Sequence, residues 1–217
     1  MSNPDSFIQE VTEEVRRDRL TGYLRRYGWI AILAVLLVVG GAAWNEWRKA
    51  RAQAEAEAFG DSVLGALEAP SAEARISALD GIEAQGARAA ILALLQAAEA
   101  QRAGDEAAAL AAFAAVEANA ALPQSYRQLA ALKRVMLGGP ALPEDERYAI
   151  LSGLAQPDMP FRALAMEQIA LLRIETGEPA AALAILRDIL EEPETTDDLR
   201  ARVRQVIVAL GGEPAAG

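Results

Sequence analysis

The chain of 217 residues contains neither histidine nor cysteine. Without these side chains, disulfides, zinc–thiolate sites and the usual nucleophile–base triads cannot form. A glycine-rich phosphate loop is also missing, because Gly138-Gly139-Pro140 lacks the Lys-Ser/Thr that would follow in such a loop. We therefore expect a protein that is not an enzyme, with no catalytic residues, no cofactor and no small-molecule substrate.

A carboxylate-rich run from Glu191 to Asp198 is the nearest approach to a metal site. It lacks the ligand spacing and the central glycine of a calcium loop. The run is more typical of a loop between two helices, in which Thr196 caps a helix whose first turn contains Asp197 and Asp198. No metal site is expected.

The charge of the chain is strongly acidic and unevenly distributed. Residues 1–51 hold eight basic and six acidic side chains, a net charge of +2; the remaining residues hold 13 basic and 25 acidic ones, a net charge of −12, which together give −10. A nucleic-acid-binding domain needs a basic surface instead. We therefore expect no nucleic acid among the partners.

An uncharged, strongly apolar run extends from Trp29 to Trp44. As a helix, the segment 27–47 is about 31 Å long, which matches a hydrocarbon core of about 30 Å. The aromatic residues at its two ends are those that the membrane interface favours, and we expect them at that interface. They are Tyr27, Trp29, Trp44 and Trp47. The run predicts a transmembrane helix over 27–47.

Two alternatives to an uncleaved anchor are a buried core helix and a cleaved signal peptide. No other segment is apolar enough to surround a core helix of this kind. The 26 residues before Tyr27 carry five acidic groups beside five arginines, unlike the short basic region of a signal peptide. Five basic residues precede the run and three follow it closely, which favours a cytoplasmic N-terminus and a periplasmic C-terminal domain. In a bacterium, the compartment on that far side of the membrane is the periplasm.

Residues 1–26 are expected to form a tail and an amphipathic helix, since Phe7, Ile8, Val11 and Val15 recur at helical spacing. This helix could dock a cytoplasmic partner, lie at the membrane interface, or simply lead into the anchor. After the anchor, alanine and leucine dominate, and glycine and proline punctuate at short intervals. The sequence predicts an all-α fold, with further helices at about 61–69, 72–85, 87–103, 105–119, 124–138, 143–155, 160–176, 179–192 and 197–210.

A repeat runs through the helical region. Aligning Gly104 with Gly177, 73 residues later, superposes two helix–turn–helix units, and the segment 124–155 fits between them as a third. Half of 73 is close to the length of a tetratricopeptide helix pair. The sequence therefore predicts an α-solenoid of tetratricopeptide-like pairs, in which Leu110 and Leu183 are buried beside the small Ala109 and Ala182.

The sequence FIQEVTEEVRRDRL…LRRYGW over 7–29, the single apolar run and the last repeat unit over 160–193 resemble one family. This is the YfgM-like family of ancillary subunits of the SecYEG translocon. The resemblance implies a single-pass inner-membrane protein whose periplasmic domain meets translocon subunits and periplasmic chaperones, and no catalytic residues. A structural coordinator of envelope assembly or cell division, which oligomerises through its helices, is the alternative.

The expected organisation is a cytoplasmic segment (1–26), the transmembrane helix (27–47), a helical connector with a first helix pair (48–85), the repeat domain (86–212) and a tail (213–217). Partners are expected on the inner face of the repeats, which the first helix of each pair lines; the alternative is that the apolar members of this set are simply core. The candidate residues are Ile91, Leu94, Ala98, Gln101, Arg102, Leu164, Glu167, Leu171, Ile174 and Glu175.

Overall fold

The computed structural model describes the backbone of residues 4–213, and the side chains of residues 29, 30 and 32–213. Every regular element in this part of the chain is a helix, so the predicted all-α class is confirmed. The chain divides into two units, residues 1–61 and residues 62–217.

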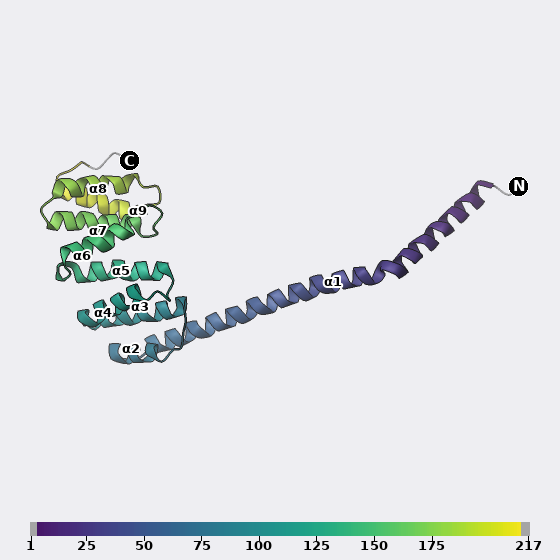
Figure 1. Cartoon of the computed structure of the whole chain (residues 1–217), viewed down its shortest axis with the longest axis horizontal. Coiled ribbons are helices and arrows are strands. Elements are labelled where there is room, and N and C mark those ends of the chain that lie inside the picture. The colour runs from purple at the N-terminus through teal and green to yellow at the C-terminus, as the bar shows by residue number, and fades with distance from the viewer. Residues whose placement is uncertain (1–3, 214–217) are drawn as a thin grey trace. The chain divides into compact units, whose positions relative to one another are not determined.

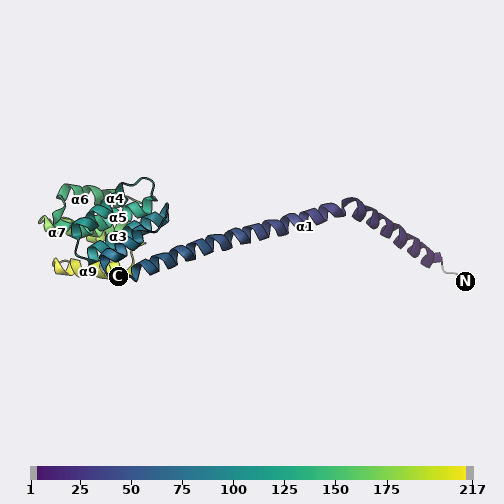
Figure 2. The same cartoon turned by 90° about the horizontal axis from the view of Figure 1, so that it is seen from below.

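The described residues of the first unit belong to one helix, α1 (Pro4–Leu67), which is the long ribbon of Figures 1 and 2. The prediction of a separate helix over 61–69 is wrong, because residues 61–67 are the last turns of α1. Gly60 does not end the helix: a lone glycine costs only about 1 kcal/mol within strong helix formers. Just before Gly60, two side-chain hydrogen bonds between residues one turn apart stabilise α1. They run from Arg51 Nε to Glu55 at 3.0 Å and from Gln53 Nε2 to Glu57 at 2.8 Å.

The second unit holds eight more α-helices among the described residues, and one short 3-10 turn (η1, Gly139–Ala141). Apart from α2, which ends five residues earlier than predicted, their ends lie within two residues of the predicted ones. The helices are α2 (Ala72–Asp80), α3 (Ala87–Arg102), α4 (Glu106–Ala118), α5 (Gln124–Gly138), α6 (Glu144–Leu154), α7 (Arg162–Glu175), α8 (Pro179–Glu191) and α9 (Asp197–Ala209).

The helices of the second unit form a stack from α2 to α8, and α9 lies beside α7 and α8 (Figure 1). From α2 to α9 each helix packs against the next, and α5 also contacts α3. Three hydrophobic clusters follow one another along the stack, one around Phe113, one around Leu151 and one around Leu186. The core is therefore a series of small clusters between neighbouring helices, as in a solenoid.

The predicted 73-residue relationship between α3–α4 and α7–α8 is present in the backbone. Gly104 and Gly177 adopt φ angles of +79° and +78°, a left-handed conformation that glycine accepts without strain. The residue after each glycine bonds back to the preceding helix in the pattern of a Schellman motif. These bonds join Asp105 N to Ala100 O at 3.0 Å and Glu178 N to Arg173 O at 2.7 Å.

Burial repeats with the same spacing. Ala109 and Ala182 are both fully buried, and the equivalent pairs Phe113/Leu186 and Val116/Ile189 are buried as well. The expected burial of Leu110 and Leu183 is wrong: both are only half-buried. Each lies one residue, about 100° around the helix, from the alanine that faces the neighbouring helix.

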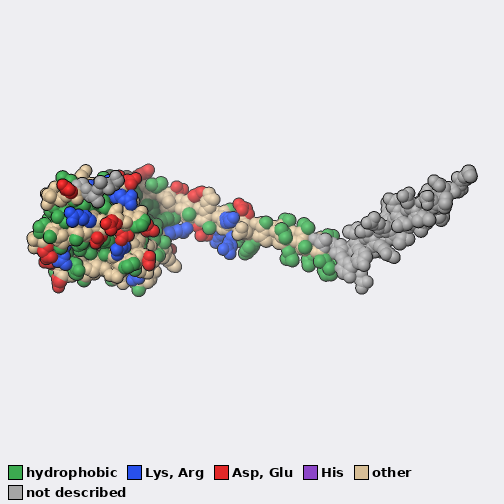
Figure 3. Space-filling model, turned by 90° about the horizontal axis from the view of Figure 1, so that it is seen from above, with side chains coloured by type: hydrophobic (Ala, Val, Ile, Leu, Met, Phe, Trp, Pro, Cys, Tyr) green, Lys and Arg blue, Asp and Glu red, His purple; other side chains and the backbone are tan. Residues whose placement is uncertain are grey.

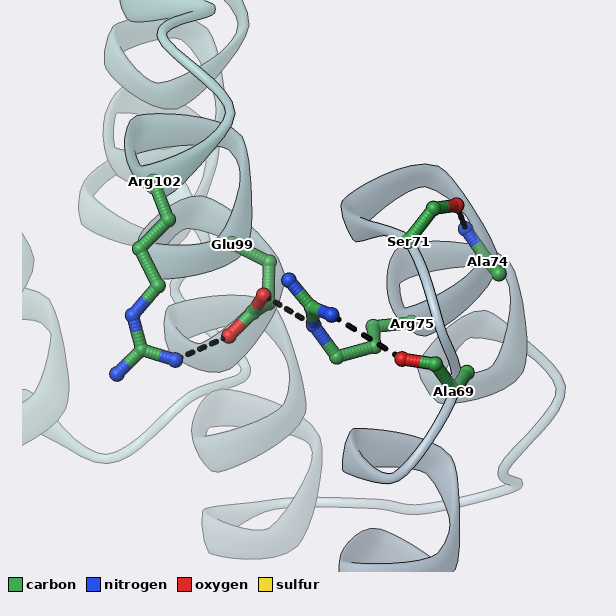
Figure 4. Close-up of polar contacts among 6 residues, drawn as sticks. All are labelled: Ala69, Ser71, Ala74, Arg75, Glu99 and Arg102. Carbon is green, nitrogen blue, oxygen red and sulfur yellow. Dashed lines mark hydrogen bonds and ion pairs between the residues drawn. The ribbon is translucent and has the colours of Figure 1, made fainter.

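A buried carboxylate ties α2 to α3 (Figure 4). Glu99 is 1% exposed and accepts hydrogen bonds from Arg75 Nε at 2.5 Å and from Arg102 Nη1 at 2.6 Å. Arg75 also donates to the carbonyl oxygen of Ala69, in the turn before α2, at 3.1 Å. The Arg75 guanidinium holds the pKa of the Glu99 carboxyl below its usual range. The side chain of Arg75 thus connects α2 to the turn before it and to α3.

Helix α9 ends the stack. Thr196 caps it as predicted, accepting a hydrogen bond from Leu199 N at 3.4 Å. Leu199, Val203 and Ile207 recur at intervals of four residues and are buried against the preceding helices. The opposite side of α9 is exposed, which is the arrangement expected of a terminal helix in a stack of this kind.

Candidate interaction surface

The ten residues predicted to contact a partner lie on α3 and α7 and form five pairs, each 73 residues apart. Three of these pairs follow one edge of α3 and the equivalent edge of α7. They are Ile91/Leu164, Ala98/Leu171 and Arg102/Glu175. Both edges change from half-buried apolar residues at the start to an exposed charged residue at the end. The structure does not bring the two sets together, since α5 and α6 lie between α3 and α7 in the stack (Figure 1).

Helix α5 carries equivalent residues on one of its faces, and the sequence interpretation missed them. Leu129 and Met136 precede Leu164 and Leu171 by 35 residues each, and Lys133 occupies the position between them. Met136 is 57% exposed although it is a large apolar residue. A 35-residue offset between α5 and α7 would have identified these positions in the sequence. We call the following set the inner stripe: Ile91, Ala98, Arg102, Leu129, Lys133, Met136, Leu164, Leu171 and Glu175.

A small hollow of about 100 Å³ lies within this stripe, between α5, α6 and α7, and Met136 and Leu171 both line it. Arg147 of α6 also lines the hollow; it is 8% exposed and donates through Nη1 to Glu175 at 2.8 Å. A buried, charged side chain held by an exposed carboxylate gives the hollow a polar wall beside its apolar ones. Such a mixture suits an apolar side chain with a polar neighbour.

A cation–π contact links α6 and α7. The guanidinium of Arg173 lies 4.9 Å from the centre of the Tyr148 ring. Tyr148 is nevertheless 42% exposed. Arginine, tyrosine and methionine are all enriched in protein interfaces, so α5, α6 and α7 offer the side chains that binding surfaces favour.

Several of the predicted contact residues already serve the fold. Glu167 is buried and holds Arg202 of α9 through two hydrogen bonds of 3.0 and 2.9 Å. Leu94 and Ile174 pack against hydrophobic clusters of the core. Gln101 is exposed at the end of α3, outside the inner stripe. Members of the inner stripe also have contacts within the fold: Leu164 packs against two of the clusters, Arg102 binds Glu99, and Glu175 binds Arg147.

The apolar stretch of α1 is exposed along its described length. Trp29, Trp44 and Trp47 have exposed fractions of 62%, 63% and 52%, and Tyr27 lies outside the residues whose side chains are described. The rings of Trp44 and Trp47 are 5.1 Å apart, and the guanidinium of Arg51 lies 5.8 Å from the Trp47 ring. This places aromatic and basic groups together at one end of the apolar stretch.

The predicted transmembrane segment 27–47 lies partly outside the described residues, because the side chains of residues 27, 28 and 31 are not described. Within the part of the chain where side chains are described, no helical stretch has the length and apolar character needed to cross a membrane. Within 27–47, the longest stretch in which every side chain is described is 32–47, and it corresponds to about 24 Å of helix.

No group of three or more carboxylates is placed to hold a metal ion in the part of the chain that the structure describes. In the run from Glu191 to Asp198, Glu192 accepts a hydrogen bond from Arg162 Nε at 2.9 Å, and Thr195 donates to the carbonyl oxygen of Ile189 at 2.9 Å. These side chains shape the connection between α8 and α9.

Comparison of the chain with protein-family models, with characterised proteins and with solved structures gave no match.

Proposed function

We propose that this protein is a membrane-anchored scaffold with tetratricopeptide-like helix pairs that binds a protein partner through the inner stripe. The observation that carries this proposal is the exposure of Met136 on α5, which lines a hollow together with Leu171 of α7. A flexible methionine side chain adapts to the shape of a partner and is enriched at binding surfaces. A helical segment or an extended peptide of the partner would lie across α3, α5 and α7.

The exposed apolar side chains of α1 support the anchor. Figure 3 shows them crowded along this stretch of the helix, next to charged residues. Ile32, Leu37 and Val38 are between 64% and 72% exposed. A protein surface in water rarely exposes a continuous apolar band of this kind. In the sequence, the apolar segment over 27–47 has the length that crossing a bilayer as a helix requires.

The resemblance of residues 7–29 and 160–193 to the YfgM-like family supports a location at the Sec translocon. The partners would then be translocon subunits and periplasmic chaperones. The basic residues, five before the apolar run and three after it, support a cytoplasmic N-terminus and a periplasmic repeat domain in a bacterial inner membrane.

Exchange of the membrane segment tests where the partner binds. Residues 29–44 would be replaced by an unrelated apolar helix of the same length, and the full-length protein would be purified from detergent-solubilised membranes together with the proteins bound to it. We expect the same partners as for the native chain, because the segment acts as a tether that raises the local concentration of the repeat domain.

Loss of all partners from a protein that still inserts into the membrane would overturn the proposal and place recognition within the bilayer. If cell-division or cell-wall proteins were recovered in place of translocon subunits, the alternative of an envelope coordinator would replace it. An alkaline phosphatase fusion after the last residue should be active, since this enzyme works only outside the cytoplasm.

A further inference from the structure

A second hollow, which we call the outer cleft, lies between α4, α5 and α6 and has a volume of about 330 Å³. Its apolar wall includes Ala131, Ile150 and Leu154, and its polar wall includes Arg127 and Gln128. On α5, Arg127 lies two residues, about 200° around the helix, from Leu129 of the inner stripe. The outer cleft is therefore on the side of α5 opposite the inner stripe.

Arg127 has no partner for its charge in the described part of the chain. The side chain is half-buried, and its Nε is shielded from solvent without a hydrogen-bond acceptor. No carboxylate among the described residues forms an ion pair with it. A shielded guanidinium N–H without an acceptor is unfavourable unless something supplies one.

Arg134, seven residues further along the same face of α5, shows what a guanidinium at this position binds. It donates through Nε to Glu117 of α4 and through Nη1 to Glu146 of α6, both at 2.7 Å. Glu117 also lines the outer cleft, but its carboxylate is held by Arg134. The described residues thus supply two carboxylates to Arg134 and none to Arg127.

We propose that the outer cleft binds an acidic side chain of a partner protein, whose carboxylate pairs with Arg127 while an adjacent apolar side chain packs against Ile150 and Leu154. Charge complementarity selects this occupant, since Arg127 is the unpaired cation of the cleft and its apolar wall suits a neighbouring residue such as leucine. The site is separate from the inner stripe and does not depend on it.

A pair of acetylated peptide amides tests the proposal: Ac-Ala-Leu-Glu-Leu-Ala-NH₂ and the same peptide with glutamine at its centre. Each would be titrated into the full-length protein in detergent micelles, with the arginine side chains labelled with nitrogen-15. We expect the glutamate peptide to shift the Nε–Hε signal of Arg127 in a saturable way, with an affinity about tenfold higher than that of the glutamine peptide. The signal of Arg134 should not move.

Two variants locate the binding. Arg127→Gln should remove the preference for glutamate. Gly153 also lines the cleft, and a Cβ atom built there meets nothing within 4 Å, so Gly153→Leu should fill the cleft without a clash. Because leucine favours the helix more than glycine does, this variant should melt no earlier than the native protein while losing the peptide.

Equal affinity for the two peptides, no binding of either up to about 10 mM, or unchanged binding by the stably folded Gly153→Leu variant would each overturn the proposal. Free N-acetylglutamate separates the two possible sources of the carboxylate. Binding of this small molecule as tightly as the glutamate peptide would show a site for free carboxylates, and would contradict a docking site for a protein segment.

Discussion

Arg75 of α2 binds Glu99 of α3, with Nε of the arginine 2.5 Å from an oxygen of a carboxylate that is almost wholly shielded from solvent. The pair joins residues that are 24 positions apart in the chain. Because Arg75 also holds the carbonyl oxygen of Ala69, the ion pair fixes the turn before α2 as well as the helix.

Replacing Glu99 with glutamine should therefore destabilise the repeat domain by about 2 kcal/mol. The substitution removes the charge that two arginines share, but both arginines retain access to water and are not left fully buried, so the cost is below that of breaking a fully buried ion pair. Urea unfolding followed by circular dichroism measures the change. Glu55→Gln, in an exposed ion pair on α1, is the control and should lower the free energy of unfolding by less than about 0.5 kcal/mol. An equal effect of the two substitutions would contradict this prediction.

The stabilisation from Glu99 should depend on pH. The Arg75 guanidinium lowers the pKa of Glu99 in the folded protein below its ordinary value of 4.5, so the ionised carboxylate favours the folded state above that pH. As the pH falls below 4.5 and through the folded-state pKa, the carboxylate is protonated and this stabilisation is lost. The difference in stability between the native protein and Glu99→Gln should thus narrow in acid. A difference that stays constant from neutral pH down to about pH 3 would refute the role of the charge.

The repeat register makes a prediction about two neighbouring leucines of α8. Leu186 is fully buried in the last cluster, whereas Leu183 is half-buried at its edge. Leu186→Ala should cost about 2–5 kcal/mol, because it leaves a cavity among packed side chains. Leu183→Ala should cost about 1 kcal/mol, since part of that side chain is already in water. Thermal melting of both variants shows which one loses more stability. A larger loss of stability from Leu183→Ala would show that the register is wrong.

Partner binding should depend on Met136 and not on apolar exposure in general. Met136→Arg places a charge at the centre of the inner stripe and should reduce recovery of the partner about tenfold or more. Val208 of α9 is equally exposed, at 58% against 57%, but lies outside the stripe, so Val208→Arg is a matched control. Neither change should alter the melting temperature. Equal loss of the partner in both variants would point to non-specific apolar binding.

The sequence predicted most helices because glycine, proline and capping residues mark their ends. Thr196 at the start of α9, and Gly104 and Gly177 at the turns, act through local backbone geometry that residue type reveals. The prediction of a new helix directly after Gly60 is wrong for a local reason too. A glycine ends a helix only where the chain adopts a left-handed turn or where its neighbours favour the helix weakly.

The surfaces were harder to predict, because they depend on contacts between helices. The role of Glu167 is set by Arg202, 35 residues later, and that of Glu175 by Arg147 on another helix. The unpaired state of Arg127 is visible only once Glu117 and Glu146 are seen to bind Arg134 instead. Pattern and spacing do not specify which of several carboxylates reaches which arginine.

The packing of each helix on its neighbours in the chain has a consequence for how the domain folds. Because most contacts join segments close in sequence, little loop entropy has to be lost before favourable contacts form, and folding should be fast for a domain of this size. The cluster around Phe113 joins α3, α4 and α5, and the cluster around Leu186 joins α7, α8 and α9, so either group of three helices can serve as a nucleus. During synthesis the hairpin of α3 and α4 can therefore form while α9 is still in the ribosome.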